Sequence, residues 1–305
     1  MSNRNETTRK ILYVLLTVVM VASLTVAALI VGVDLVDMWR ADSVSDEVRQ
    51  LYRPGASGGW FAALISAASA EEEVPAEEDA GRDAMLAPVK LPNVQEDFLR
   101  LYGENPDVVG WLTAGDTIDL PVVQRDNEYY LSHNFFGEWD SNGTVFLNGM
   151  NVFYPRDRVL LLHGHNMRSG AMFGTLAKYA EAGYAFAHAL LTFRTLYDEK
   201  TSYYVPVAAF HASMLEGEAG YFDVTPMNFD TEDAFQAYLE AALKRSAWIS
   251  PADVSVQDEM LMLLTCSYYH ADGRFVLLCR RLREGETPEG MRRLFDEAAQ
   301  RATGE

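Results

Sequence analysis

The stretch LLTCSYYHADGRFVLLCRRL, from Leu263 to Leu282, contains two apolar runs separated by a polar segment. Short apolar runs bounded by Ser, Asp and Gly residues are typical of buried strands joined by a turn. The first run ends at Cys266, and Arg274 lies at the start of the second. If the strands pair as a hairpin, the thiol and the guanidinium come close together. A cysteine nucleophile needs a base or a cation nearby, so this pair is a candidate reaction centre.

A second segment, RVLLLHGHNMRSGAMFG, begins at Arg158 and carries two histidines. Its apolar run is strand-like and delivers His165 to a glycine-containing turn, which gives the imidazole exposure on a rigid base. His163 and His165 alternate along the strand end, so both could face one cleft. A single histidine, cysteine or arginine is more often a packed or surface residue. Only the combination indicates chemistry.

Composition excludes several classes of function. The chain has 305 residues and a net charge of −19, so it would repel the phosphates of a nucleic acid, and no nucleic-acid partner is expected. Neither C-x-x-C nor H-E-x-x-H spacing occurs, so a zinc site has no support. No metal and no cofactor is expected. Cys266 and Cys279 could in principle form a disulfide, but Cys279 lies in the apolar run FVLLCRR, which favours a packed thiol.

The N-terminus predicts a single-pass membrane anchor. Residues 11–33 carry no charge, and a helix of that length spans a bilayer core of about 30 Å. Basic residues precede the run and acidic residues follow it, which favours a cytoplasmic tail of residues 1–10 and an extracellular remainder. A cleaved signal peptide is the alternative. The run is longer than a signal peptide's apolar region, and no A-x-A cleavage site follows it closely.

The rest of the chain divides into segments by composition and by the pattern of apolar residues. Residues 34–93 are acidic and rich in Ala, Gly and Pro, and they predict an extracellular stalk. An amphipathic helix is expected from residue 94 to about 103. A helix is also expected over 172–180, a long one over 230–248 with Asp230 or Thr231 as its N-cap, and a helical tail over 285–305. Eight short strand-like runs predict a mostly β fold with a closed barrel and added helices; they span residues 108–114, 118–124, 143–148, 158–165, 187–196, 201–212, 259–266 and 273–282.

The order of these segments resembles the class B sortases over about residues 94–284. NPDVVGWL, IDLPVVQ, DNEYYLSHNFFG and GTVFLN are similar to the front half of that family. HGHNMRSGAMFGTLAKY is similar to its histidine segment, and LLTCSYYHADGRFVLLCRRL to its cysteine–arginine segment. The long helix before the cysteine strand is the class B addition to the sortase barrel.

The resemblance implies a function and roles for individual residues. Sortases are membrane-anchored cysteine transpeptidases of Gram-positive bacteria. They cleave a sorting motif near the C-terminus of a secreted protein and pass the acyl group to an amine of the cell-wall precursor or of a pilin subunit. On this resemblance Cys266 attacks, His165 donates and later accepts the proton, and Arg274 supports the substrate and the oxyanion. The catalytic domain would be residues 94–284, outside the cell.

The resemblance also implies a substrate groove. Asn127 and Leu131 match positions that line it, and Thr265 and Ser267 flank the cysteine as further substrate contacts. The loop between Phe210 and Asp230 and the helix after it would close the other side.

Two positions depart from the family pattern. His163 stands where relatives usually carry tyrosine, and Leu264 stands where many carry serine.

Two other functions stay open at this point. An L,D-transpeptidase would place its cysteine in an S-H-G-C context, which is absent. A membrane-tethered wall-binding module without activity could share the barrel. The sequence does not choose between anchoring of surface proteins and polymerisation of pilins, and it does not give the sorting motif.

Overall fold

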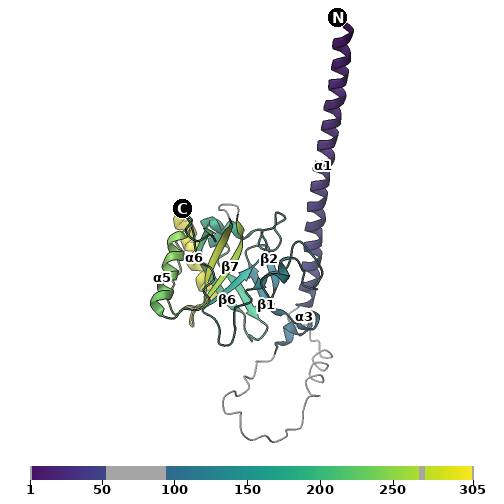
Figure 1. The fold of residues 1–305 in the computed structure, drawn as a ribbon. Coiled ribbons are helices and arrows are strands. Elements are labelled where there is room, and N and C mark those ends of the chain that lie inside the picture. The colour runs from purple at the N-terminus through teal and green to yellow at the C-terminus, as the bar shows by residue number, and fades with distance from the viewer. Residues whose placement is uncertain (1, 53–93, 268–271, 304–305) are drawn as a thin grey trace. The chain divides into compact units, whose positions relative to one another are not determined.

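A computed structural model describes residues 2–52, 94–267 and 272–303 (Figure 1). It divides into two compact units, Met1–Ser43 and Val44–Glu305. The first unit is the greater part of helix α1, Ser2–Leu51. Within it, Leu15–Val33 is long and apolar enough to cross a membrane, and none of that window is buried by other parts of the protein. This is the candidate membrane span.

The end of α1 belongs to the second unit. Val48 is buried against Phe98 and Leu101, and the ring of Tyr52 stacks on Trp111 at 4.3 Å between centroids. The first part of the expected stalk is therefore helical as far as Leu51. Residues 53–93, which make up the remainder of that expected segment, lie outside the described residues.

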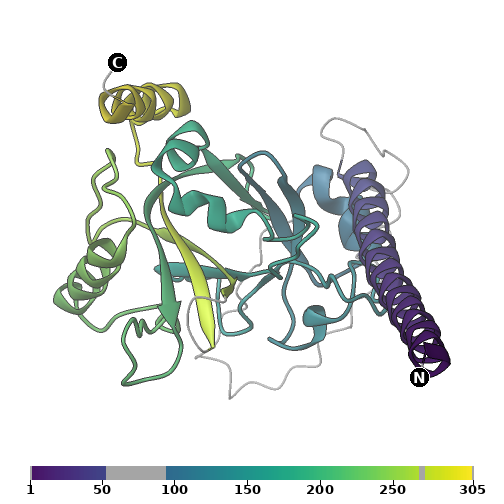
Figure 2. The ribbon, with the colours of Figure 1, turned by 90° about the horizontal axis from the view of Figure 1, so that it is seen from above.

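The second unit is built on a closed barrel of eight strands in the order β1-β2-β3-β4-β7-β8-β6-β5 (Figures 1 and 2). Each strand falls within, or within one residue of, a run that the sequence predicts, and the expected fold class is confirmed. The strands are β1 Val108–Ala114, β2 Ile118–Val123, β3 Phe146–Leu147, β4 Val159–His163, β5 Leu191–Thr195, β6 Ser202–Ser213, β7 Met260–Ser267 and β8 Gly273–Arg281.

Two pairings in the barrel position the site. β4 and β7 run parallel, with His163 opposite Leu264. β7 and β8 form the antiparallel hairpin, with Cys266 opposite Arg274. The ends of β4 and β7 therefore open at the same mouth of the barrel, and β8 begins there.

The runs in β4 and β7 are continuously apolar because both faces of these strands are buried. Leu160, Leu162 and Leu263 belong to the cluster inside the barrel, whereas Leu161 and Met262 belong to a second cluster outside it. Cys279 also lies in the inner cluster as a free, fully buried thiol, which confirms the packed-thiol interpretation. Its burial raises the pKa of that thiol.

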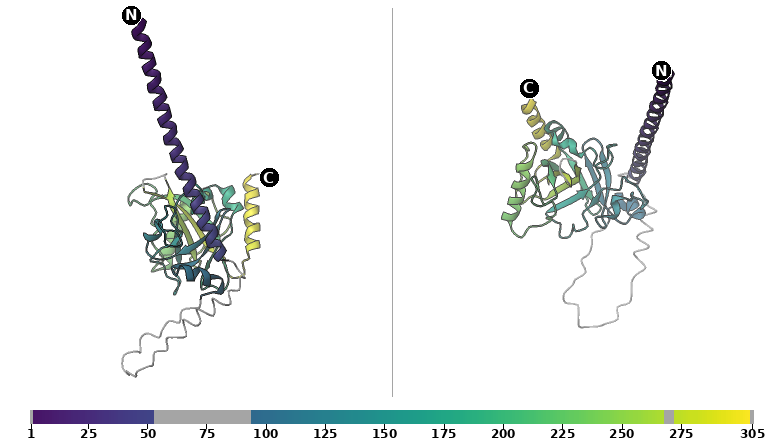
Figure 3. Two further views of the ribbon diagram at one scale, coloured as in Figure 1. Left: turned by 90° about the vertical axis from the view of Figure 1, so that its right-hand side faces the viewer. Right: turned by 45° about the horizontal axis from the view of Figure 1, so that its top comes forward.

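Helices cover the outside of the barrel. Helix α5, Glu232–Arg245, is green in Figure 2 and seals the second cluster with Phe235 and Leu239. Helix α6, Pro288–Thr303, is yellow in Figure 3 and packs on α4, Ala182–Ala187, through Phe295 and Phe186. The remaining helical segments are η1 Glu96–Phe98, α3 Leu99–Glu104, η2 Tyr129–Leu131 and η3 Leu176–Ala180.

Candidate active site

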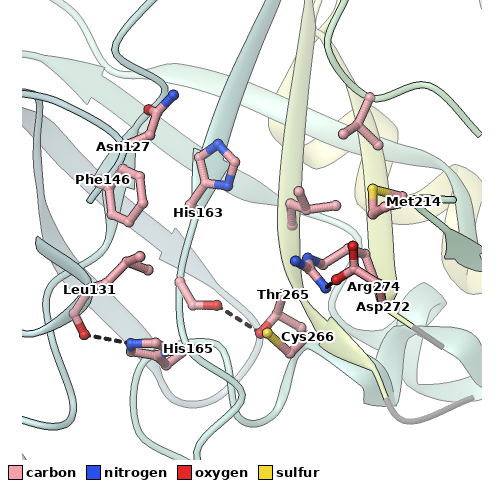
Figure 4. A pocket seen from close by; sticks show the side chains of 13 residues that line it. Asn127, Leu131, Phe146, His163, His165, Met214, Thr265, Cys266, Asp272 and Arg274 are labelled. Carbon is pink, nitrogen blue, oxygen red and sulfur yellow. Dashed lines mark hydrogen bonds and ion pairs between the residues drawn. The ribbon is translucent and has the colours of Figure 1, made fainter. Parts of the chain in front are cut away.

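The thiol of Cys266 is exposed although its strand is buried. Thr265 and Ser267, on either side, are 2% and 8% exposed, because alternate side chains of a strand point to opposite faces. Cys266 takes the face that opens at the barrel mouth, where Figure 4 shows its sulfur on the same side of the strand as His165. Deep burial of this thiol would argue against a nucleophile, and the structure shows it exposed instead.

His165 follows β4, and its ring has one hydrogen-bond partner among the described residues. Its Nε2 lies 2.7 Å from the carbonyl oxygen of Leu131. A carbonyl oxygen only accepts, so Nε2 carries a proton, and in the neutral ring Nδ1 is the nitrogen with a free lone pair. The ring therefore has one nitrogen committed to the protein and one available for proton transfer.

Three hydrogen bonds join the histidine turn to the cysteine strand. The side-chain amide of Asn166 donates to the carbonyl oxygen of Cys266 at 2.8 Å, and the hydroxyl of Thr265 donates to the carbonyl oxygen of Gly164 at 2.7 Å. The amide of Gly164 donates to Leu264 at 3.2 Å. Glycine is required there, because a Cβ would lie 2.7 Å from the ring of Phe173. These contacts fix His165 and Cys266 to one another through the backbone.

Arg274 is held by one edge of its guanidinium. Its Nη1 donates to a carboxylate oxygen of Asp272 at 2.8 Å and to the carbonyl oxygen of Gly273 at 3.0 Å. Its Nε and Nη2 have no hydrogen-bond partner among the residues that the structure describes. Those donors are available to an oxyanion or a substrate carbonyl.

Cys266, His165 and Arg274 line one pocket of about 340 Å³ (Figure 4). Asn127, Leu131 and Thr265 line it too. The expected closing loop supplies Met214 and Val224 to the wall. The pocket thus combines reactive groups with apolar wall residues.

The four expected substrate contacts differ in what they offer. Leu131 is 42% exposed and presents an apolar surface. Asn127 accepts from the backbone amide of Gly149 at 2.7 Å, so its carbonyl oxygen braces a loop. The hydroxyl of Thr265 is already committed to Gly164. Ser267 lies outside the lining of this pocket, and its hydroxyl lies 2.6 Å from Nδ1 of His211.

Sequence reasoning missed the residues that brace the site, namely Asn166 and Asp272, and the wall residue Phe146. Asn166 is in the HGHN motif, so its position was available as a signal. Asp272 is two residues before Arg274, a spacing that carries little information by itself. His270 lies outside the described residues.

His163 is partly buried beside the reactive groups. Its ring stacks on Phe146 at 4.9 Å, and its Nε2 lies 3.1 Å from the side-chain amide nitrogen of Asn148. Burial, and then the positive charge of Arg274, lower the pKa of His163 to about 4. This second imidazole is therefore neutral at physiological pH.

Comparison with known proteins identifies relatives of this chain. No protein-family model matches it. It is 32% identical over 175 residues to sortase B of Listeria monocytogenes, covering 57% of this chain and 68% of that protein. It is 26% identical over 200 residues to sortase B of Staphylococcus aureus, covering 64% and 79%.

Solved structures agree with these relatives. The structure of sortase B from Bacillus anthracis in complex with AAEK1 has a TM-score of 0.61 and 24% identity, covering 82% of this chain and all of that one. Sortase B of Clostridium perfringens has a TM-score of 0.54 and 27% identity, covering 60% and 98%. The sequence match, the closed barrel and the arrangement of the thiol, imidazole and guanidinium all point the same way, and the chain belongs to the class B sortase family.

Proposed function

We propose that this sortase cleaves a C-terminal sorting motif of secreted proteins and transfers the acyl group to an amine of the cell wall or of a pilin subunit. The observation that carries the proposal is the exposed thiol of Cys266, paired across a hairpin with Arg274 and sharing a pocket with His165. Family membership supplies the transpeptidase class.

The first half-reaction forms a thioester. The thiolate of Cys266 attacks the scissile carbonyl carbon, and Nε and Nη2 of Arg274 stabilise the oxyanion that develops. The C–N bond then breaks, and the imidazolium of His165 gives its Nδ1 proton to the leaving amine. Nε2 does not exchange its proton, because it stays bonded to the carbonyl oxygen of Leu131.

The second half-reaction reverses the proton flow. An amine attacks the thioester carbon and loses a proton to Nδ1 of the now neutral His165. The C–S bond breaks, and Cys266 leaves as the thiolate that began the cycle. The enzyme ends in its starting protonation state, so one imidazole is sufficient for both steps.

The test uses the full chain in detergent micelles with a panel of fluorogenic sorting peptides and an amine acceptor. We expect cleavage of some peptides, transfer to the amine, and loss of both in Cys266→Ala. A matched control is Cys279→Ala, which removes the buried thiol and leaves the exposed one. Cleavage surviving in Cys266→Ala would refute the nucleophile. No cleavage by the wild type across the panel would favour a wall-binding module without activity.

The same proposal places residues 1–10 in the cytoplasm, 11–33 in the membrane and the catalytic domain, 94–284, outside. The support is the apolar helix at Leu15–Val33 and the cell-surface role of sortases. A membrane-impermeant maleimide should label the protein in intact cells. The label would be on Cys266, because its thiol is exposed whereas Cys279 is fully buried. Labelling that requires permeabilised cells would reverse the orientation.

A further inference from the structure

His163 is a polar group in the reactive pocket that the proposed mechanism does not use. It is the last residue of β4 and lines the same pocket as Cys266 and Arg274. Figure 4 shows its ring between Phe146 and Asn127 on one side and Arg274 on the other. The resemblance to the family implies tyrosine at this position in most relatives, whereas this chain has histidine.

The hydrogen bonds around Asn148 determine which nitrogen of His163 carries the proton. The side-chain oxygen of Asn148 accepts from the backbone amide of Met150 at 3.0 Å, which fixes the orientation of the amide group. Its NH₂ group therefore faces Nε2 of His163, at 3.1 Å. An NH₂ group only donates, so Nε2 must accept. The single proton of the neutral ring is then on Nδ1.

Nδ1 is the ring nitrogen of His163 that Asn148 does not contact, and the ring lines the pocket. Nδ1 has no hydrogen bond to any residue in the described part of the chain. The side chain of His163 is also only partly buried. A donor without a partner among the described residues, on a partly buried ring that lines a pocket, can bond a ligand that fills the pocket.

The same geometry keeps the ring neutral. A second proton on Nε2 would point at the NH₂ hydrogens of Asn148, and the pocket already holds the positive charge of Arg274. The other titratable groups that line the pocket are Cys266, His165 and Asp272, and the carboxylate of Asp272 is paired with Arg274. His163 is thus unsuited to shuttle protons and suited to donate one fixed hydrogen bond.

We propose that His163 is a specificity-determining residue whose Nδ1–H donates a hydrogen bond to a backbone carbonyl oxygen of the bound peptide. The inference rests on the proposed function. An extended peptide presents carbonyl oxygens at regular intervals to a groove wall, and main-chain hydrogen bonds give such peptides affinity and register. His163 would therefore set which residue of the sorting motif reaches Cys266.

The first test compares wild type with His163→Phe in the full chain in detergent micelles. Phenylalanine retains the ring that stacks on Phe146 and removes the N–H. With the best fluorogenic peptide of the panel, we expect kcat/KM to fall about tenfold, as for loss of one buried hydrogen bond. His163→Tyr should recover part of the loss because it restores a donor. The control His188→Phe changes a histidine that lines a different pocket, and its rate should not change.

A thioamide scan of the same peptide identifies the contact. Replacing one backbone carbonyl oxygen at a time by sulfur weakens each acceptor in turn. We expect one position at which wild type slows and His163→Phe does not slow further. Equal sensitivity of both proteins at every position would overturn the substrate contact and leave a packing role. A wild type that cleaves no peptide would instead overturn the proposed function, so the two failures are distinguishable.

The second test does not need activity. Nitrogen NMR of the histidine-labelled full chain, with His163→Phe to assign the signal, reports the tautomer and the protonation state of the ring. We expect a neutral ring protonated at Nδ1 from pH 8 down to about 5. Asn148→Asp replaces the donor by an anion, so it should raise the pKa of His163 and put a proton on Nε2. A neutral ring protonated at Nε2 in the wild type would overturn the inference.

Discussion

At the scale of single residues, Asp272 orients the guanidinium of Arg274. Its backbone has a positive φ of 46°, and its carboxylate accepts a hydrogen bond from Nη1 of the guanidinium. We expect Asp272→Asn to lower kcat/KM about tenfold, because a neutral amide orients the cation less firmly. The loss should fall mainly on kcat, since the oxyanion forms only in the transition state. Asparagine tolerates positive φ, so backbone strain does not change.

The measurement is steady-state cleavage of a fluorogenic peptide by the full chain. Asp230→Asn is the matched control, because it removes the same charge from an exposed position outside the pocket lining. An unchanged kcat in Asp272→Asn, with a normal melting profile, would show that Arg274 needs no such support.

The residues of the site differ in how far the sequence predicts them. The approach of Cys266 to Arg274 follows from a local hairpin, so it could be predicted from one short stretch. The contact of His165 with Leu131 bridges 34 residues, and that of Asn166 with Cys266 bridges 100. The contact of Asn166 with Cys266 depends on β4 lying parallel to β7, and no local pattern encodes that pairing.

At the scale of elements, the N-cap residue Thr231 sets the start of α5. The hydroxyl of Thr231 accepts from the backbone amide of Ala234 at 3.1 Å, and acids occupy the first turn. We expect Thr231→Ala to lower the free energy of unfolding by about 1 kcal/mol, because one helix-terminal N–H loses its acceptor. Urea titration of the full chain in detergent, followed by tryptophan fluorescence, measures it. Thr201→Ala, at an exposed position, is the control, and an equal effect there would contradict the cap.

The C-terminal tail is attached to the barrel through a buried cation. Arg280 on β8 is fully buried, and Nη1 and Nη2 each donate to a carboxylate oxygen of Glu286, at 2.6 and 2.8 Å. We expect Glu286→Ala to cost about 3 kcal/mol of unfolding free energy, because it leaves a buried charge without its main partner. Glu289→Ala removes an exposed acid from the same region and should change stability little. Similar urea midpoints for the two variants would contradict this.

The elements also show where local patterns stop being informative. The strands were predictable because alternating or continuous apolar runs reflect burial directly. The helix expected over 172–180 is instead a short 3-10 turn at Leu176–Ala180 followed by a separate α4. The turn ends at Glu181, where the backbone is extended. Helix α1 extends to Leu51 because Val48 has a core to enter, and only tertiary structure reveals that core.

At the scale of the whole molecule, the barrel contains a histidine that is neutral when folded and can be charged when unfolded. The pKa of His163 falls from its usual 6.5 to about 4 on folding, so between these values the unfolded chain binds more protons. Stability contributed by the neutral ring is complete above pH 6.5 and is lost as the pH falls towards 4. The whole effect is about 3 kcal/mol.

Other groups act in the same direction, so the variant difference is what isolates His163. The hydrogen bond from Arg280 lowers the pKa of Glu286, and that stability is also lost as the pH falls. We expect urea titrations at pH 7 and pH 4 to show that wild type loses about 3 kcal/mol more than His163→Phe. Because this comparison needs no substrate, it tests the partly buried neutral imidazole separately from its contact with a peptide. Equal losses in the two proteins would mean that the ring is hydrated enough to accept a proton at its usual pKa, and the fixed donor inferred above could not then persist in the folded pocket.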